Sequence, residues 1–518
     1  MTYRDAGRMA SYLLVTLAIA LAACGPAPAT EPAPTASPAT APPPSATAPV
    51  APPTPSEVLL PTAASLPEAP LSADGPWLLM AANDGLWAVN PDGSGLTRLY
   101  SPPLPPAGCD GCAYYDAYVA PSGARVAVLE LEAAYPEFVP RLRILSLPGG
   151  QTEALTELMP TMDEWRTRYQ TYYDDVWAAV GVWNRAAWSP DGRLFAFNGA
   201  MDGPSADLYI YDVEGDTITR LTTGETQSVD PTWSPDGLTI VHGAAESVNY
   251  GSSGGGDPTM GGVWTARPDD VSVNLLFASD VTAREEIVGW ISDTTYLGDT
   301  CYHGYDEHCE NLRTVNVNTG ETVPVFPGSH LDRAYDPTTR TLLVSVTPEL
   351  YPAPDVEPGL YLIAAEGGEP VRIPAVEPQP DDRLLWSEEA GRFLLDTAEG
   401  LMAITTTGDV TRIAPHVPAV WIGLDAAFSG PFCAAVREDG SLWVGTMGQE
   451  LTRLWIGSVH DPLWSPDGQH LFFFDTLGDV DTLYVTQAPD FRPILTVATI
   501  IVEYGWAGAF DPLTWAWP

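Results

Sequence analysis

One five-residue motif, Trp-Ser-Pro-Asp-Gly, occurs three times in this 518-residue chain, each time before an apolar run typical of a strand. Proline fixes φ, aspartate can accept backbone N–H bonds, and glycine tolerates a positive φ. The motif therefore predicts a tight turn between two antiparallel strands. The residues assigned to these turns are Trp188, Pro190, Asp191, Gly192, Trp233, Pro235, Asp236, Gly237, Trp464, Pro466, Asp467 and Gly468.

Weaker copies of the same frame lie between and beyond these three. They are centred on Val119, Trp290, Tyr335, Trp386, a position near Leu424 and a last one near Trp506. Successive copies are mostly about 40 to 57 residues apart, which is the period of propeller blades. The sequence therefore predicts an all-β fold: a single closed β-propeller of eight or nine four-stranded blades over residues 73–518.

The first unit of this domain lacks a first strand, because it starts directly at the apolar run from Trp77. The end of the chain has a spare first strand, which we assign to Glu503–Trp506. Joining the two would close the ring and protect its strand edges.

The Trp-Ser-Pro-Asp-Gly turns resemble the repeats of the bacterial TolB-type, WD-repeat-like propellers. The resemblance covers nearly all of the chain after residue 75, and it implies a fold rather than a function. TolB itself has a separate domain before its propeller and belongs to a trans-envelope complex. Here a Pro-rich stretch leads directly into the first blade, so we do not infer that role.

The N-terminal residues read as an export signal. Arg4 and Arg8 precede a short apolar run, which is too short for a permanent membrane span. The segment Leu21-Ala22-Ala23-Cys24 resembles the bacterial lipobox. That resemblance implies cleavage after residue 23 and acylation of the Cys24 thiol; the alternative is an ordinary secretory signal in which Cys24 is incidental. We expect an exported protein, held at the cell membrane or outer membrane by lipid alone.

Residues 24–72 are dominated by Pro, Ala, Thr and Ser, which predicts a disordered stalk. The formal net charge is −44 and all 23 basic residues are Arg, so nucleic-acid binding is excluded. We expect a monomer.

Five cysteines follow the lipobox. Cys109 with Cys112, and Cys301 with Cys309, form close pairs that predict local disulfides in an oxidising compartment. The first pair could instead be a redox C-x-x-C motif. The second could bind zinc together with His303 and His308. Cys433 lies in an apolar run and is expected to be a buried free thiol.

Two further patterns carry less weight. Gly251–Gly255 matches G-x-S-x-G, but it lies in a Gly/Ser-rich loop rather than between a strand and a helix. Asp475, Asp479 and Asp481 could hold Ca²⁺, although a solvated acidic loop explains them better. We predict no cofactor, with calcium or zinc as the alternatives.

A helical insertion is predicted after the second blade, over about residues 160–183. Thr161 and Glu164 form a capping-box pattern at its start. An aromatic stripe follows at helical spacing, consisting of Trp165, Tyr169, Tyr172 and Trp177. The stripe either packs onto the propeller or forms a binding surface.

No complete catalytic constellation is recognisable. We therefore expect a membrane-anchored binding or scaffold module for a protein, peptide or glycan, and not an enzyme. The alternative is an extracellular hydrolase or lyase with a site on a propeller face, acting with or without the assistance of a metal ion.

Overall fold

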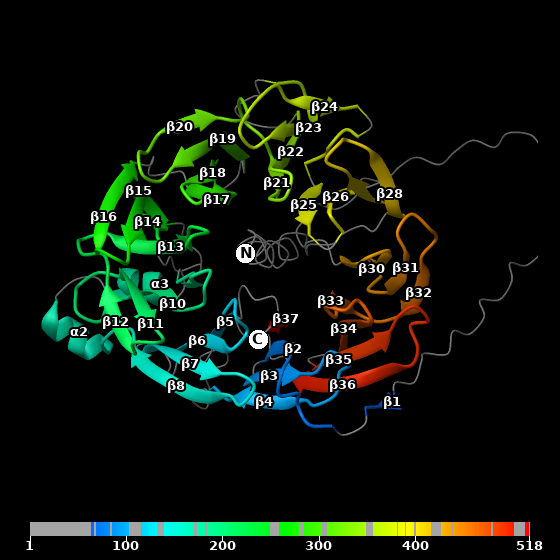
Figure 1. The fold of residues 1–518 in the computed structure, drawn as a ribbon, viewed down its shortest axis with the longest axis horizontal. Helices are drawn as coiled ribbons and strands as arrows, with labels where there is room; N and C mark the ends of the chain where they lie inside the picture. The colour runs from blue at the N-terminus through cyan, green and yellow to red at the C-terminus, as the bar shows by residue number, and fades with distance from the viewer. Residues whose placement is uncertain are drawn as a thin grey trace, which may run out of the picture.

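The computed structural model describes residues 64–66, 69–82, 85–102, 115–131, 139–169, 173–181, 184–248, 258–278, 284–302, 308–348, 356–374, 376–380, 382–388, 390–397, 400–415, 426–437, 439–477, 480–501 and 513–516. These residues form nine antiparallel sheets arranged as a ring (Figure 1). The predicted propeller is confirmed, with nine blades. Among the described residues, no helix is both long and apolar enough to cross a membrane.

The first five blades are built as follows. Blade 1 contains β37 (Leu513–Ala516), β2 (Trp77–Ala82), β3 (Gly85–Val89) and β4 (Thr97–Tyr100). Blade 2 contains β5 (Tyr115–Val119), β6 (Arg125–Leu131), β7 (Pro140–Ser146) and β8 (Gln151–Glu157). Blade 3 contains β9 (Ala187–Trp188), β10 (Leu194–Gly199), β11 (Asp207–Asp212) and β12 (Thr217–Arg220). Blade 4 contains β13 (Gln227–Trp233), β14 (Ile240–Val248), β15 (Pro258–Arg267) and β16 (Ser272–Phe277). Blade 5 contains β17 (Arg284–Ser292), β18 (Thr295–Tyr302), β19 (His308–Asn316) and β20 (Thr322–Pro324).

The remaining four blades repeat the same order. Blade 6 contains β21 (Asp332–Asp336), β22 (Thr341–Val346), β23 (Gly359–Ala364) and β24 (Val371–Ile373). Blade 7 contains β25 (Arg383–Ser387), β26 (Arg392–Thr397), β27 (Gly400–Ile404) and β28 (Val410–Pro415). Blade 8 contains β29 (Ala426–Ser429), β30 (Phe432–Val436), β31 (Leu442–Thr446) and β32 (Thr452–Trp455). Blade 9 contains β33 (Val459–Trp464), β34 (His470–Leu477), β35 (Val480–Gln487) and β36 (Ile494–Ile501), with β1 (Ala64–Ser65) added at its edge.

The alternating strand direction gives the propeller two unlike faces. Figure 1 shows the first strand of each blade near the central axis and the fourth at the rim. One face, called here the turn face, carries the links between first and second strands and between third and fourth strands. The opposite face, called here the connection face, carries the links between second and third strands and between successive blades. The described helical residues between blades 2 and 3, 162–168 and 173–181, belong to a link of the connection face.

The three motif copies form identical turns on the turn face. In the second copy, Ser234 Oγ donates to Asp236 Oδ1 at 2.6 Å and accepts from the Thr239 amide at 3.0 Å. Gly237 has φ of 69°, which explains the requirement for glycine. In the first two copies the motif tryptophan also bonds the preceding blade: Trp188 Nε1 donates to Tyr118 O at 2.8 Å, and Trp233 Nε1 donates to Ala187 O at 3.0 Å.

The ring closes through the C-terminal strand. β37 pairs with β2 in antiparallel register, with Leu78 opposite Trp515. The predicted closing strand, Glu503–Trp506, lies outside the described residues, and the strand that closes the ring is Leu513–Ala516. The reason is that Trp515 takes the place of the motif tryptophan: its Nε1 donates to Trp464 O of blade 9 at 2.9 Å.

The N-terminal side of the domain also joins the ring. β1 pairs in parallel with the start of β36, with Ala64 opposite Leu495. Trp77 Nε1 donates to Ser72 O at 2.8 Å, which fixes the chain as it enters β2. Sheet pairing therefore begins nine residues before the boundary predicted at residue 73, within the segment predicted to be a stalk.

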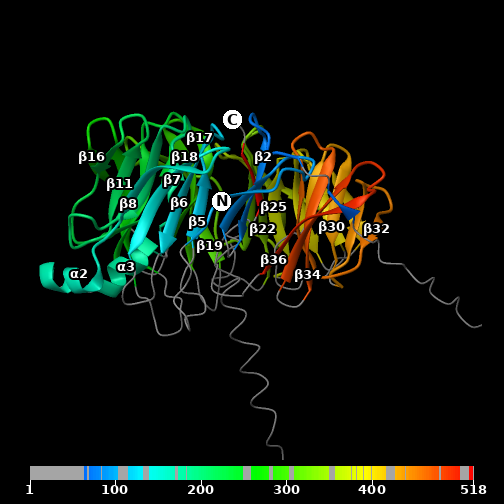
Figure 2. The same cartoon turned by 90° about the horizontal axis from the view of Figure 1, so that it is seen from below.

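The insertion after blade 2 contains two helices rather than the one predicted. α2 (Met162–Arg168) begins with the expected capping box, in which Thr161 and Glu164 bond reciprocally. α3 (Tyr173–Gly181) packs on β10, β13 and β14. Figure 2 shows both helices at the connection-face edge of the ring, beside blades 2 to 4.

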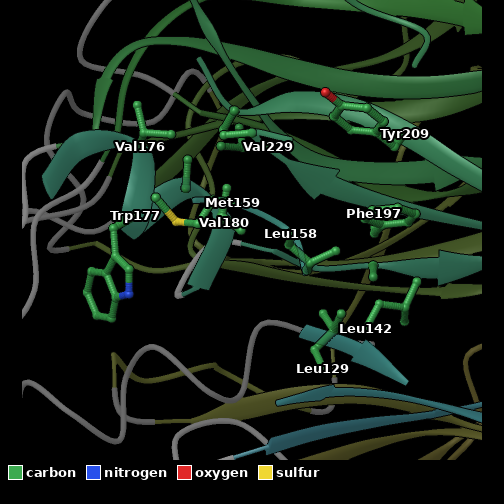
Figure 3. Close-up of a cluster of buried hydrophobic side chains, with 14 of the residues drawn as sticks. Leu129, Leu142, Leu158, Met159, Val176, Trp177, Val180, Phe197, Tyr209 and Val229 are labelled. Atoms are coloured by element: carbon green, nitrogen blue, oxygen red, sulfur yellow. The ribbon is translucent and has the colours of Figure 1, made fainter. Parts of the chain in front are cut away.

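The aromatic stripe of the insertion is mostly interior. Trp165 and Trp177 are buried, with 0% and 7% of their surfaces exposed, and Tyr169 packs against the same apolar cluster. Figure 3 shows Val176 and Val180 of α3 beside Val229 of β13 within this cluster. Of the two alternatives for the stripe, packing onto the propeller therefore holds for Trp165 and Trp177, which lie in the buried cluster. Tyr172 lies outside the described residues.

Because the three motif turns have the same hydrogen bonds, replacing the serine in any one of them should destabilise the protein by the same amount. We expect Ser189→Ala, Ser234→Ala and Ser465→Ala each to lower the free energy of unfolding by about 1–2 kcal/mol, because each removes two buried hydrogen bonds. Urea unfolding of the three variants measures this. Three unchanged midpoints would show that these hydroxyls do not hold the turns.

Candidate functional site

The described charged groups on the innermost strands are concentrated towards the connection face. Asp230 of β13 and Asp461 of β33 occupy equivalent places, three residues before the motif tryptophan and directly before a proline. Both lie in β-bulges, and both have a left-handed backbone, with φ of 52° and 48°. Bulges redirect side chains, and here they turn each carboxylate towards a cation.

Asp230 links three consecutive blades. Its carboxylate forms an ion pair with Arg284 of β17 in blade 5. It also lies 3.4 Å from Nε of Arg185, which precedes β9 in blade 3. A side chain at the inner edge of blade 4 thus joins both neighbouring blades.

The most buried charged group lies between blades 5 and 6. Arg333 of β21 binds Glu286 of β17 at 2.6 Å, and its Nε lies 2.7 Å from Oδ2 of Asp299 on β18. His330 Nε2 lies 2.8 Å from the same Asp299 oxygen. The side chains of Asp299 and His330 are fully buried, so Arg333 compensates the charge of Asp299 away from water.

The carboxylate of Glu285, close to Asp299, has a different environment. Burial raises the pKa of Glu285 to about 7, although Arg313 Nη2 donates to its Oε2 at 2.8 Å. Burial would also raise the pKa of Asp299, but the charges of His330 and Arg333 outweigh it and hold that pKa below its usual range. Two adjacent carboxylates with separated pKa values are the kind of pair that can divide acid and base roles.

The Cys301–Cys309 disulfide forms beside this cluster, as predicted. It joins β18 to β19 with an S–S distance of 2.13 Å. Cys309 and His330 exchange two backbone hydrogen bonds of 2.9 Å. The potential ligand atoms of Asp299, Cys309 and His330 consequently all lie within 4.8 Å of one another.

The zinc set considered from the sequence is arranged differently. Both sulfurs belong to the disulfide, and His308 stacks on Tyr302 with ring centroids 5.0 Å apart. His303 lies outside the described residues. The imidazole next to the sulfurs is His330, which is twenty-one residues beyond Cys309 and which no local motif indicated.

A second cluster lies in blade 9 and has the outline of a Thr–His–Asp relay. His460 Nδ1 lies 2.7 Å from Asp461, and its Nε2 lies 3.1 Å from the Thr476 hydroxyl. Burial would lower the pKa of His460, but Asp461 and Asp481 outweigh it and raise that pKa to about 10. His460 is therefore charged at neutral pH and cannot accept the Thr476 proton. Thr476 donates to Asp481 instead, so the cluster is a charge clamp.

The proposed calcium carboxylates do not converge among the described residues. Asp475 accepts from Trp455 Nε1 and from the Ser458 amide, at 3.0 and 2.8 Å. Asp481 faces His460, and Asp479 lies outside the described residues.

Of the remaining candidate residues from the sequence, one is described by the structure and the others are not. Cys433 is a buried free thiol, as expected, and burial raises its pKa to about 11. Cys24, Cys109, Cys112 and Gly251–Gly255 lie outside the described residues. Asp230 and Asp461 could have been recognised in the sequence, because each stands in an Asp-Pro pair before a motif tryptophan. No local sequence pattern marks Asp299, Glu285 or Arg333.

No protein-family model matches the chain. It is 41% identical over 66 residues to an uncharacterized peptidase of Bacillus subtilis, and 35% identical over 89 residues to an uncharacterized protein of Agrobacterium fabrum. These matches cover 12% and 17% of the chain, and only 10% and 26% of the two relatives.

Similar solved structures include an oligogalacturonate lyase in complex with manganese, with 13% identity and a TM-score of 0.34 over 73% of this chain and 97% of the lyase. A protein assigned as TolB from Agrobacterium tumefaciens has 20% identity and a TM-score of 0.30 over 50% and 79% of the two chains. Dipeptidyl peptidase 4 of Porphyromonas gingivalis has 12% identity and a TM-score of 0.42 over 75% and 60%. These scores are too low to carry an argument about the chain.

The blade 9 clamp predicts a pH-dependent stability. The pKa of His460 is raised to about 10, above an unfolded value of about 6.5, so its contribution is complete below pH 6.5 and is lost as pH rises through 10. We expect His460→Gln to destabilise the protein at pH 6 and to make little difference above pH 10. Urea unfolding at pH 6, 8 and about 11 checks this. A constant difference across that range would contradict the assignment of charge to His460.

Proposed function

We propose that this protein is a non-enzymatic binding module, lipid-anchored through Cys24 outside the cytoplasm, which binds a protein, peptide or glycan on the connection face. The observation that carries the proposal is the division between the two faces. Among the described residues, the helical insertion and the Cys301–Cys309 disulfide between β18 and β19 lie towards the connection face.

The turn face offers fewer groups to a ligand. The turns of 189–194, 234–239 and 465–470 satisfy their own polar groups, since each serine hydroxyl donates to the aspartate and accepts from an amide of the same turn. A polar group that is already paired gains little from a ligand. Recognition is therefore favoured at the opposite end.

Charge narrows the ligand class. The chain has 67 acidic and 23 basic residues, and many of the described Arg side chains are paired within the propeller. Such a surface attracts cationic groups and repels polyanions. A basic segment of a protein or peptide fits this field better than an acidic glycan.

The proposal is tested by blocking one face at a time. Pro204 is exposed in the connection between β10 and β11, and Leu238 is 48% exposed in a turn of the opposite face. Each would be replaced in the full chain, as Pro204→Cys or Leu238→Cys, and coupled to a large polyethylene glycol. Binding to an array of basic peptides, acidic peptides and oligosaccharides is then measured.

We expect the polymer at Pro204→Cys to weaken the strongest array signal at least tenfold, and the polymer at Leu238→Cys to leave it nearly unchanged. The matched pair controls for the polymer itself. Binding that is lost only when the turn face is blocked would overturn the assignment, as would an array on which the unmodified chain binds nothing.

A hydrolase or lyase on the same face is the second candidate. It is favoured by Glu285, since a carboxyl with a pKa of about 7 is suited to general acid–base catalysis. If the chain turns over an oligosaccharide or peptide, Glu285→Gln should reduce kcat by roughly 100-fold or more. Arg313→Gln serves as a control, because it removes the partner of Glu285 and keeps the carboxyl. Turnover that is unchanged in Glu285→Gln would remove this candidate.

A further inference from the structure

The Cys301–Cys309 disulfide lies against two buried side chains with metal-binding chemistry. Asp299 supplies a carboxylate, His330 supplies an imidazole, and both are fully buried. Their potential ligand atoms and the Cys309 sulfur fit within 4.8 Å. Two thiolates, one imidazole and one carboxylate are a ligand set that tetrahedral Zn²⁺ accepts.

One oxygen in this group has no partner. Asp299 uses Oδ2 for both His330 and Arg333, while Oδ1 is buried and lacks a hydrogen bond among the described residues. A buried carboxylate oxygen without a partner costs about 1–3 kcal/mol or more. Such an oxygen is explained if another state of the protein gives it a ligand.

We propose that Cys301 and Cys309, when reduced, form with His330 and Asp299 a site for one Zn²⁺ or a similar thiophilic divalent cation. The disulfide and the metal site are then alternative states of the same cysteine pair. This proposal does not depend on the ligand of the connection face.

The interconversion is balanced with a dithiol as the reductant. The dithiol transfers two electrons and two protons to the Cys301–Cys309 bond, leaving two thiols and becoming a disulfide itself. Binding of Zn²⁺ then releases both thiol protons, because the thiolate is the metal ligand. Any proton on His330 Nε2 is released as well.

The net charge around the site stays small when the disulfide is replaced by two thiolates and Zn²⁺. Apart from any proton on His330, the carboxylates of Asp299 and Glu286 and the guanidinium of Arg333 together carry a single net negative charge. In the metal-bound state two thiolates cancel Zn²⁺, and neutral His330 leaves a single net negative charge. A buried site near neutrality avoids most of the desolvation cost of isolated ions.

The backbone also holds the ligands in place. Cys309 and His330 are joined by two backbone hydrogen bonds, and Cys301 and Cys309 are directly opposed on β18 and β19. These contacts do not depend on the sulfur–sulfur bond. The three chain segments should therefore stay together after reduction.

The test uses the full chain with Cys24→Ser, Cys109→Ser, Cys112→Ser and Cys433→Ser, so that only the proposed pair remains. The protein is produced once under a dithiol reductant and once oxidised, stripped of metal and titrated with Co²⁺. Absorption from thiolate-to-cobalt charge transfer reports the ligands, and circular dichroism reports the fold. Zn²⁺ is then added in competition.

We expect the reduced chain to bind one Co²⁺ with a thiolate signal that Zn²⁺ displaces, and the oxidised chain to give no such signal. His330→Gln and Asp299→Asn should each weaken binding roughly tenfold or more. The chain that also carries Cys301→Ser and Cys309→Ser is the matched control and should not respond.

Three results would overturn the proposal. The first is a folded, reduced chain with no thiolate–cobalt signal. The second is equal affinity with and without His330 and Asp299, which would show binding by the two thiols alone. The third is loss of the propeller fold on reduction, since the site needs His330 held beside Cys309.

Discussion

The pairing of β37 with β2 is the constraint on which the rest of the structure depends. A propeller blade has hydrogen-bonding groups to satisfy along its first strand, and the first blade of this chain begins only at its second strand. The C-terminal strand fills that place, and Trp515 then repeats the contact that Trp188 and Trp233 make with their preceding blades. β1 adds a second attachment, at the rim of blade 9. The first blade is thus assembled from both ends of the domain.

Closure also separates the two faces. Each blade has four strands in alternating directions, so every blade begins and ends its path at the connection face. The turn face is then left with short links, and in the three motif turns the serine hydroxyls bond within the turn itself. Ion pairs between neighbouring first strands, such as Arg284 with Asp230 and Arg333 with Glu286, hold adjacent blades in register near that connection face. The same geometry that builds the ring therefore gathers the buried charges, the insertion and the disulfide at one end.

Much of this architecture could be read from the sequence, because it depends on local patterns. The turns follow from Trp-Ser-Pro-Asp-Gly, the helix start from Thr161 and Glu164, and the disulfide from the spacing of Cys301 and Cys309. The closing strand was placed too early, since a four-residue strand has a weak pattern and its register depends on β2. The helical stripe could not be oriented from periodicity, because a face that packs on a propeller and a face that binds a ligand have the same spacing.

The buried cluster was beyond sequence reasoning for a different physical reason. Asp299, His330 and Arg333 lie on β18, on the link between blades and on β21, and only the ring brings them together. Asp230 and Asp461 were closer to recognition, since each precedes a proline at a fixed distance from a motif tryptophan. Ion pairs between blades have no sequence signature until the order and register of the blades are known.

Hydrogen exchange on a chain that ends at residue 512 tests ring closure most directly. The account predicts that removing residues 513–518 strips protection from the amides of β2 and weakens that of β34, while the amides of β18 and β22 on the far side of the ring stay protected. Trp515→Ala in the full chain should produce a smaller loss in the same strands. If β2 remains as protected in the shortened chain as in the full one, the ring is closed by something other than β37, and the account is wrong.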